Sequence, residues 1–220
     1  MNIDFHAHLL PGADHGSDGI ETSRRQLLLA REAGIDRVAA TPHFYPRREP
    51  IESFLARRAA CMQALREAAD TSFVLCGAEV QLCRSLHHIV RLEELCIEGT
   101  RVLLLELPPD FSVRAYAQTL DALLFERKLT VVLAHIDRYD PQLIDFLLEF
   151  GCFGQLNAES FCRLRTRRRS LAWAKEARVV ALGSDLHGAE IGYRDFLRAK
   201  ARLGADYDAL MRRTENLLFG

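Results

Sequence analysis

Hydrophobic residues recur along the chain in short runs, and longer amphipathic stretches separate these runs. Seven runs have the composition of β-strands and span residues 2–9, 37–44, 72–82, 101–108, 129–136, 152–160 and 178–187. Two segments of them, "VLLLEL" and "TVVLA", are apolar at successive positions instead of alternating. Such continuous runs are typical of parallel strands whose two faces are both covered.

The stretches between the runs carry helix signals. Ser and Pro favour helix starts, and Gly favours the position just after the end. These signals delimit helices predicted over residues 22–34, 112–128 and 141–151, with Ser112 and Pro141 at two starts and Gly34 and Gly151 at two ends. Strand and helix alternate about seven times, which predicts an α/β fold of βα repeats, as an open sheet or a barrel. No linker or composition shift divides the chain, so we expect one domain over residues 1–220.

The charge balance narrows the range of partners. Lysine plus arginine (29) nearly equals aspartate plus glutamate (30), and the net charge is −1, so nucleic acid is not expected as the main partner. The start "MNIDFHAHLL" lacks a basic segment followed by a long apolar one, and no uncharged apolar run of about 18 residues occurs. We therefore expect a cytoplasmic protein that is not inserted in a membrane.

Six cysteines are scattered without a Cys-x-x-Cys pair, which predicts reduced and mostly buried thiols. No cysteine opens a Gly-rich Cys-x5-Arg loop, so a thiol nucleophile is not expected. One strong charge run, "RLRTRRRS" from Arg163 to Ser170, opens the helix that contains Trp173. We interpret this basic run either as a solvated helix face or as a docking site for an acidic peptide tail.

Side chains with nitrogen or oxygen ligand atoms gather at the carboxyl ends of the predicted strands. In an extended segment alternate side chains share a face, so His6 and His8 point the same way. In a parallel βα barrel the carboxyl ends of all strands meet at one mouth, where the chemistry takes place. The residues at these ends are His6, His8, His43, Glu79, Glu106, His135, Asp185 and His187, and Asp14 follows in the turn after the first strand.

Four of these residues are carboxylates, and like charges a few ångströms apart do not all stay ionised without compensation. Two or three divalent cations would supply that compensation. Imidazole and carboxylate ligands without thiolate suit manganese, iron or zinc. The sequence therefore predicts a metal site at the barrel mouth.

In this order along the chain, seven motifs resemble the PHP (polymerase and histidinol phosphatase) superfamily: "DFHAHLLPGADHG", "ATPHF", "GAEV", "LLLELP", "AHIDRY", "QLNAESF" and "GSDLHG". Within it the chain is most similar to the manganese-dependent protein-tyrosine phosphatases of bacterial capsule and exopolysaccharide systems. The resemblance implies a distorted (β/α)7 TIM-like barrel, the PHP fold, with a trinuclear centre in which manganese is the expected metal. Carried over by position, it implies a first metal held by His6, His8, Glu79 and Asp185, a second by Glu79, Glu106 and His135, and a third by Asp14, His43 and His187.

The chain departs from the usual motifs at two places. Such proteins usually read Asp-Asp-Gly where this chain has Asp14-His15-Gly16, and His-Pro-Glu-Arg-Tyr where it has "HIDRY" from His135. His15 is interpreted as an extra ligand, a phosphate contact or a solvated turn residue.

Four arginines are candidates for anion binding. Arg138 and Arg194 are expected to neutralise phosphate oxygens through bidentate contacts. Arg47 and Arg48 follow His43 and would rim the mouth, where they attract an acidic peptide.

These features predict a metal-dependent phosphomonoesterase in which water, activated by the cations, attacks phosphorus. The resemblance implies a protein-tyrosine phosphatase that regulates capsule or exopolysaccharide synthesis, with the tyrosine-rich tail of a bacterial tyrosine kinase as partner. The alternatives are a phosphatase for histidinol phosphate or another small phosphoester, and a non-catalytic regulatory module stabilised by metal. The sequence does not define the oligomeric state.

Overall fold

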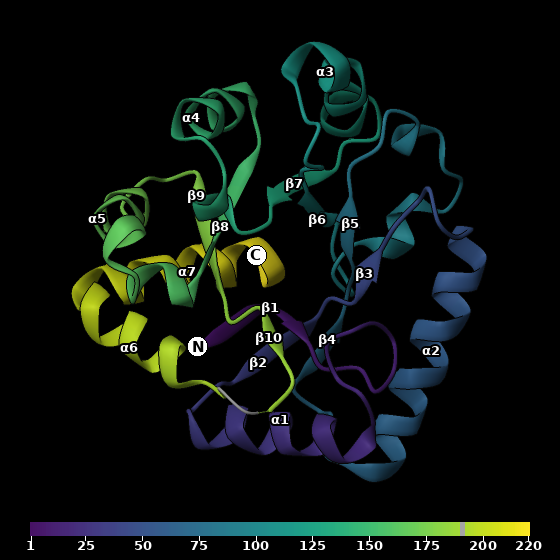
Figure 1. Ribbon diagram of the computed structural model, residues 1–220, viewed down its shortest axis with the longest axis vertical. Helices are drawn as coiled ribbons and strands as arrows, with labels where there is room; N and C mark the ends of the chain where they lie inside the picture. The colour runs from purple at the N-terminus through teal and green to yellow at the C-terminus, as the bar shows by residue number, and fades with distance from the viewer. Residues whose placement is uncertain (190–191) are drawn as a thin grey trace.

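The computed structural model describes residues 1–189 and 192–220. Strands occupy the centre and helices surround them (Figure 1). The strands are β1 (Ile3–His8), β2 (Arg37–Ala40), β3 (His43–Phe44), β4 (Val74–Cys76), β5 (Glu79–Gln81), β6 (Val102–Glu106), β7 (Thr130–Leu133), β8 (Phe153–Asn157), β9 (Val179–Gly183) and β10 (Leu186–His187). The α-helices are α1 (Ile20–Glu32), α2 (Ile51–Ala68), α3 (Val113–Asp121), α4 (Pro141–Phe150), α5 (Leu164–Trp173), α6 (Arg194–Leu203) and α7 (Ala205–Phe219). Short helical turns are η1 (Leu86–His88), η2 (Leu92–Leu95), η3 (Ala122–Glu126), η4 (Ile136–Arg138) and η5 (Ala158–Phe161).

The seven predicted strands appear as ten pieces because three of them bend. The bends fall at residues 41–42, 77–78 and 184–185, and they divide the strands between two sheets. The sheet orders are β10-β1-β2-β4 and β3-β5-β6-β7-β8-β9, and all strand pairs are parallel. β9 is the last strand of the six-stranded sheet, and β10 continues the same bent strand and pairs with β1 of the other sheet. This bent strand therefore connects the two sheets. The predicted distorted barrel is therefore confirmed.

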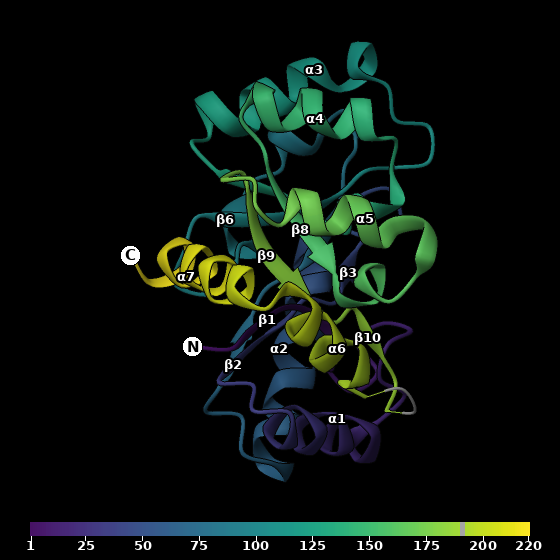
Figure 2. The same ribbon diagram turned by 90° about the vertical axis from the view of Figure 1, so that its left-hand side faces the viewer.

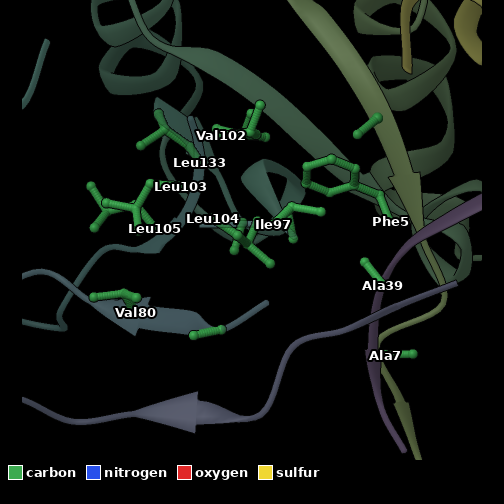
Figure 3. Close-up of a cluster of buried hydrophobic side chains, with 14 of the residues drawn as sticks. Phe5, Ala7, Ala39, Val80, Ile97, Val102, Leu103, Leu104, Leu105 and Leu133 are labelled. Carbon is green, nitrogen blue, oxygen red and sulfur yellow. The ribbon is translucent and has the colours of Figure 1, made fainter. Parts of the chain in front are cut away.

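The strands share one hydrophobic core, as expected for a single domain. In β6 the successive residues Leu103, Leu104 and Leu105 are all fully buried, which confirms that both faces of this strand are covered. Their side chains lie near those of Val80 on β5 and Leu133 on β7 (Figure 3). Continuous apolar sequence thus corresponds to strands enclosed between the barrel interior and the surrounding helices.

The predicted helices form within two residues of their expected bounds, and the stretch 112–128 continues from α3 into a π-helical turn at η3. Gly34 and Gly151 have φ values of 73° and 124°, the left-handed region that glycine adopts without a steric penalty. The α4 helix also has a side-chain cap, because the carboxylate of Asp140 accepts a hydrogen bond from the backbone N–H of Leu143 at 3.1 Å.

Both chain ends lie on the same side of the barrel (Figure 2). The amino group of Met1 forms an ion pair with Glu215 of α7 at 3.2 Å, and α7 packs against β1 and β9. Among the described residues, no helix has the length and apolar character that crossing a membrane requires.

All six cysteines are free, as expected for reduced thiols. The basic run forms the first turns of α5. Arg163 pairs with Glu159, and the guanidinium of Arg169 lies 5.4 Å from the ring centre of Trp173. Arg165 and Arg168 are exposed, and whether they bind an acidic tail stays a prediction.

Candidate metal centre

The centre begins at the carboxyl end of β1, where His6 and His8 point to the same face, as the strand alternation predicts. Both imidazoles are fully buried, and their Nε2 atoms lie 3.0 Å apart. The Oε2 atom of Glu79, the first residue of β5, lies 3.2 Å from each of these nitrogens. Asp185, which follows β9, places Oδ1 at 3.6 Å from Nε2 of His6 and 3.4 Å from that of His8.

The opposite ring nitrogens of the two histidines face oxygen acceptors. Nδ1 of His6 lies 3.2 Å from Oε1 of Gln155, and Nδ1 of His8 lies 2.7 Å from Oδ2 of Asp14. In a neutral imidazole one nitrogen carries the proton and the other a lone pair. These partners place the protons on Nδ1 and leave both Nε2 lone pairs facing each other and two carboxylates. Such a convergence of electron-rich atoms requires a cation or extra protons.

Glu79 is the most connected side chain of the centre. Its Oε1 lies 2.8 Å from Nε2 of His135, and its Oε2 lies 2.9 Å from Nδ1 of His43. Although close, the buried Nδ1 of His43 has no hydrogen bond of acceptable geometry. Glu106, at the end of β6, places Oε1 at 3.8 Å from Nε2 of His135. The carboxylate of Glu79 therefore contacts imidazoles on both sides of the cluster.

Three overlapping groups offer ligand atoms that all lie within 4.8 Å of one another: His6, His8 and Glu79; His43, Glu79 and Glu106; and His8, His43 and His187. The structure thus brings together the residues expected at the strand ends. Asp14 joins them at the edge, where its Oδ2 also accepts a hydrogen bond from the backbone N–H of His43 at 2.9 Å. His187 is exposed, and its ring centre lies 4.1 Å from that of His8.

The pKa values of the cluster are shifted because its imidazoles and carboxylates lie so close together. Burial alone lowers the pKa of His8, but hydrogen bonds to Asp14, Asp185 and Glu79 raise this pKa well above its ordinary value. Burial and the charge of Glu79 raise the pKa of Glu106. Conversely, although burial opposes the effect, His6, His135 and His43 hold the pKa of Glu79 well below its usual range. These opposite shifts show that the carboxylates of the cluster favour positive charge on the neighbouring imidazoles.

The backbone is strained at two of the site residues. His135 and Asp185 have φ values of 33° and 52°, in the left-handed region that residues with a Cβ rarely adopt. Each lies two residues beyond the last residue of a strand, His135 after β7 and Asp185 after β9. Strained conformations of this kind concentrate at functional sites, where the surrounding structure holds them.

Arg138 connects the centre to a hollow beside it. Its guanidinium pairs with Oδ2 of Asp185. A cavity of about 160 Å³ opens here. Its wall includes one guanidinium and three carboxylates, together with other polar groups and an apolar side: Arg138, Glu159, Asp185, Asp195, Asn157, Ser184, His187, Ala158, Leu186 and Phe196. The cavity therefore places one guanidinium and an apolar wall beside the cluster.

The structure does not bring Arg194 to this pocket. Arg194 is the first residue of α6, its side chain is exposed, and its guanidinium lies 3.9 Å from the carboxylate of Asp195. It is not among the described residues that form the cavity wall. Its contact with phosphate stays a prediction.

The rim of the mouth carries stacked rings. His15 is exposed, and its ring centre lies 4.7 Å from that of His43 and 4.8 Å from that of His187. The ring of Tyr45 stacks on the other side of His43 at 5.2 Å, and the guanidinium of Arg48 lies 4.5 Å from the Tyr45 ring centre. His15 and Arg48 therefore lie at the exposed rim of the centre.

Several buried polar residues outside the predicted ligand set support the centre. Gln155 and Asn157 lie on one face of β8 and contact His6 and Asp185. Asp4, fully buried on β1, accepts hydrogen bonds from the backbone N–H and the hydroxyl of Ser184 at 2.8 and 2.6 Å, and so holds the segment that carries Asp185. Polar residues at alternate positions of otherwise buried strands were the available signal.

The donor set fits divalent metal ions. Buried imidazole nitrogens with free lone pairs, the unpartnered Nδ1 of His43 and four carboxylates form a ligand set of nitrogen and oxygen. The cysteines take no part in the groups within reach of one ion, as far as the described residues show. The chemistry of the ligands does not distinguish manganese, iron and zinc.

The fold is similar to those of several solved structures. A chain from the crystal structures of YwqE from Bacillus subtilis and CpsB from Streptococcus pneumoniae, described as unique metal-dependent tyrosine phosphatases, matches with 22% identity and a TM-score of 0.79, over 98% of this chain and 94% of that one. A lactonase from Listeria monocytogenes matches with 9% identity and a TM-score of 0.66, over 100% and 94% of the two chains. A TatD-like protein from Archaeoglobus fulgidus matches with 13% identity and a TM-score of 0.57, over 98% and 99%.

No curated protein matches the chain. A family model described as "Capsular polysaccharide synthesis, CpsB/CapC" matches residues 2–207, nearly the whole chain. This match confirms the expected relationship to proteins of bacterial capsule systems, and the chain belongs to the CpsB/CapC family of capsular polysaccharide synthesis proteins.

Proposed function

We propose that this protein is a metal-dependent protein-tyrosine phosphatase that hydrolyses phosphotyrosine and thereby regulates capsule or exopolysaccharide synthesis. The observation that carries the proposal is the buried convergence of the His6 and His8 Nε2 atoms on Glu79, directly beside a cavity that contains Arg138. Family membership and the fold shared with metal-dependent tyrosine phosphatases support it.

We assign two or three divalent cations to the centre, with manganese as the expected metal. The first position uses His6, His8, Glu79 and Asp185, the second uses Glu79, Glu106 and His135, and the third uses Asp14, His43 and His187. Cations bound there would supply the Lewis acidity that lowers the pKa of water and offsets the charge of the phosphate. The central location of Glu79, within 3.2 Å of four imidazoles, supports its role as a shared ligand.

The protein side chains would bind and orient the phosphate ester. Arg138 presents a guanidinium at the cavity, where bidentate hydrogen bonds to two phosphate oxygens neutralise their charge. Leu186 and Phe196 form an apolar wall for the aryl ring. Because a phenol has a pKa of about 10, its departure needs less protonation than that of an alcohol, and this favours phosphotyrosine over alkyl phosphates.

The proposed partner is a phosphotyrosine-containing protein, namely the tyrosine-rich tail of a bacterial tyrosine kinase. Membership in a capsular polysaccharide synthesis family supports this choice. Arg47 and Arg48 are both exposed, and Arg48 lies at the mouth against Tyr45, where they would attract an acidic peptide.

The test is kcat/KM of the manganese-reconstituted protein on a multiply phosphorylated tyrosine peptide, beside histidinol phosphate at the same metal concentration. We expect a clear preference for the peptide that a chelator abolishes and manganese restores. Preference for histidinol phosphate would move the protein to small-molecule metabolism and overturn the proposed substrate. Manganese binding with turnover of neither substrate would indicate a non-catalytic module. The Asp185→Asn variant serves as a control for turnover at the centre itself.

A further inference from the structure

A pair of buried amides lies behind the centre on β8. Gln155 and Asn157 are two residues apart, so they share a face of the strand, and they are 0% and 2% exposed. The backbone N–H of His135 donates a hydrogen bond to Oε1 of Gln155 at 2.7 Å. A backbone N–H only donates, so this contact identifies which atom of the Gln155 amide is the oxygen.

The position of the Gln155 oxygen also determines the orientation of the Asn157 amide. With Oε1 directed at His135, Nε2 of Gln155 donates to Oδ1 of Asn157 at 2.9 Å. The other amide atom of Asn157, Nδ2, then donates to Oδ2 of Asp185 at 2.9 Å. The backbone N–H of Asn157 donates to Asp137 at 3.0 Å and anchors the strand end. Every amide atom in the series of hydrogen bonds from His135 to Asp185 therefore has one defined role.

The same oxygen of Gln155 determines the protonation of His6. Nδ1 of His6 lies 3.2 Å from Oε1, which accepts and does not donate. Nδ1 therefore carries the proton, and the lone pair of the neutral ring lies on Nε2, on the side of Glu79. A ring held in the opposite tautomer would present an N–H to the cation position and would not ligate.

Gly183 on β9 packs closely against Gln155 and His6. A Cβ atom at Gly183, the residue that pairs with Asn157 across the sheet, would lie 2.6 Å from Nε2 of Gln155 and 2.6 Å from Cβ of His6. Both distances are shorter than real contacts allow. Glycine at this position of β9 gives the two side chains the space they need.

We propose that Gln155 is a positioning residue, which sets the tautomer of His6 and, through Asn157, orients Asp185 for metal binding. This inference rests on the metal centre of the proposed function. Gln155 contacts the ring of one residue assigned to the first position and the backbone of one assigned to the second, so a single amide aligns both. Residues behind the ligands typically change metal affinity by about 10- to 100-fold when they are replaced.

The test measures manganese affinity and stoichiometry of the metal-free full-length protein by calorimetric titration, without reference to turnover. Gln155→Leu removes both the acceptor and the donor, and we expect its affinity to fall about 10- to 100-fold. Gln155→Glu keeps the acceptor for His6 and His135 but replaces the donor to Asn157 by an oxygen and adds a negative charge, so its affinity should fall by less. Thr214→Val is the matched control, because it removes buried side-chain hydrogen bonds, to the backbone carbonyls of Leu210 and Val180, that involve no ligand residue.

Each outcome has a defined meaning. Weak binding by Gln155→Leu, partial rescue by Gln155→Glu and unchanged binding by Thr214→Val support the inference. Equal affinities of Gln155→Leu and the wild type overturn it while the metal centre stands, whereas a wild type that binds no manganese overturns the proposed function itself. If Gln155→Leu does not fold, Gln155→Asn replaces it, since its shorter amide cannot reach both partners. Affinity of Gln155→Asn equal to that of the wild type would contradict the inference.

Discussion

The carboxylate of Asp185 links Arg138 to the buried histidines. Its Oδ2 pairs with the guanidinium of Arg138, and its Oδ1 lies 3.4 Å from Nε2 of His8. Burial raises the pKa of Asp185, but His6, His8 and Arg138 together hold it below its usual range. Because the Asp185 side chain is buried and the Arg138 side chain is half-exposed, the pair joins the interior of the centre to its solvent-facing cavity.

This link makes Arg138 the first residue to change. Arg138→Met should lower kcat/KM on a phosphotyrosine peptide by about 100-fold or more, because the removed donor neutralises charge that develops on phosphate. Arg138→Lys keeps the charge but loses the bidentate geometry, so it should restore only part of the activity. Steady-state kinetics at saturating manganese measures both. Full activity of Arg138→Met would exclude the assigned phosphate contact. Arg194→Met tests the exposed second candidate in the same assay.

Glu79→Gln should affect metal binding more than any other single change at the centre. The substitution preserves shape but removes the negative charge that His6, His8, His43 and His135 surround. We expect loss of at least one bound metal ion per chain and of nearly all phosphatase activity. Elemental analysis of the purified protein after manganese loading measures the first effect. Wild-type stoichiometry in this variant would contradict the shared-ligand assignment.

The metal-free protein should lose stability as the pH rises above neutral. Carboxylates raise the folded-state pKa of His6 and His8 against the lowering effect of burial, so their contribution is complete below about pH 6.5 and is lost as the pH rises through the raised values. The pKa of Glu79 is lowered, so its contribution is present above about pH 4.3 and is lost in acid. Stability should therefore be greatest between these limits.

Urea unfolding in the presence of a chelator, from about pH 3 to about pH 9, measures this profile. Excess manganese should abolish the decline at high pH, because the cations replace the protons between the histidines and the carboxylates. A metal-free protein whose free energy of unfolding rises steadily from neutral to alkaline pH would contradict this account of the cluster.

Thiol reagents should leave activity intact. Burial raises the pKa of Cys96 and of Cys152 to about 12, so neither forms a reactive thiolate near neutral pH. Iodoacetamide at neutral pH should therefore preserve kcat/KM, while a chelator removes it. Inactivation by iodoacetamide at a rate that phosphate slows would instead indicate a cysteine in the substrate site.

The sequence was sufficient to predict the parallel βα repeats and the polar side chains that gather at the strand ends, because both depend on local patterns. Continuous apolar runs such as that of β6 indicate buried parallel strands, and the alternation of His6 and His8 indicates a common face.

The roles of Gln155 and Asn157 depend on which side chains meet across β8 and β9, and a single sequence does not define these contacts. The bend at Asp185, with φ of 52°, also follows from tertiary packing and not from a Gly or Pro signal. Arg194 follows a strand end in the sequence, yet its side chain lies in solvent against Asp195.

A methyl group at Gly183 should damage the centre without touching a ligand atom. Gly183→Ala places Cβ at 2.6 Å from both Nε2 of Gln155 and Cβ of His6, and neither neighbour can move without breaking the hydrogen bonds behind the centre. We expect a lower melting temperature and weaker manganese binding. Gly19→Ala is the matched control, because Gly19 has extended φ and a Cβ added there would have no contact within 4 Å among the described residues. Equal manganese affinity of Gly183→Ala and Gly19→Ala would contradict this account, because it would show that β9 shifts to make room for the added methyl group.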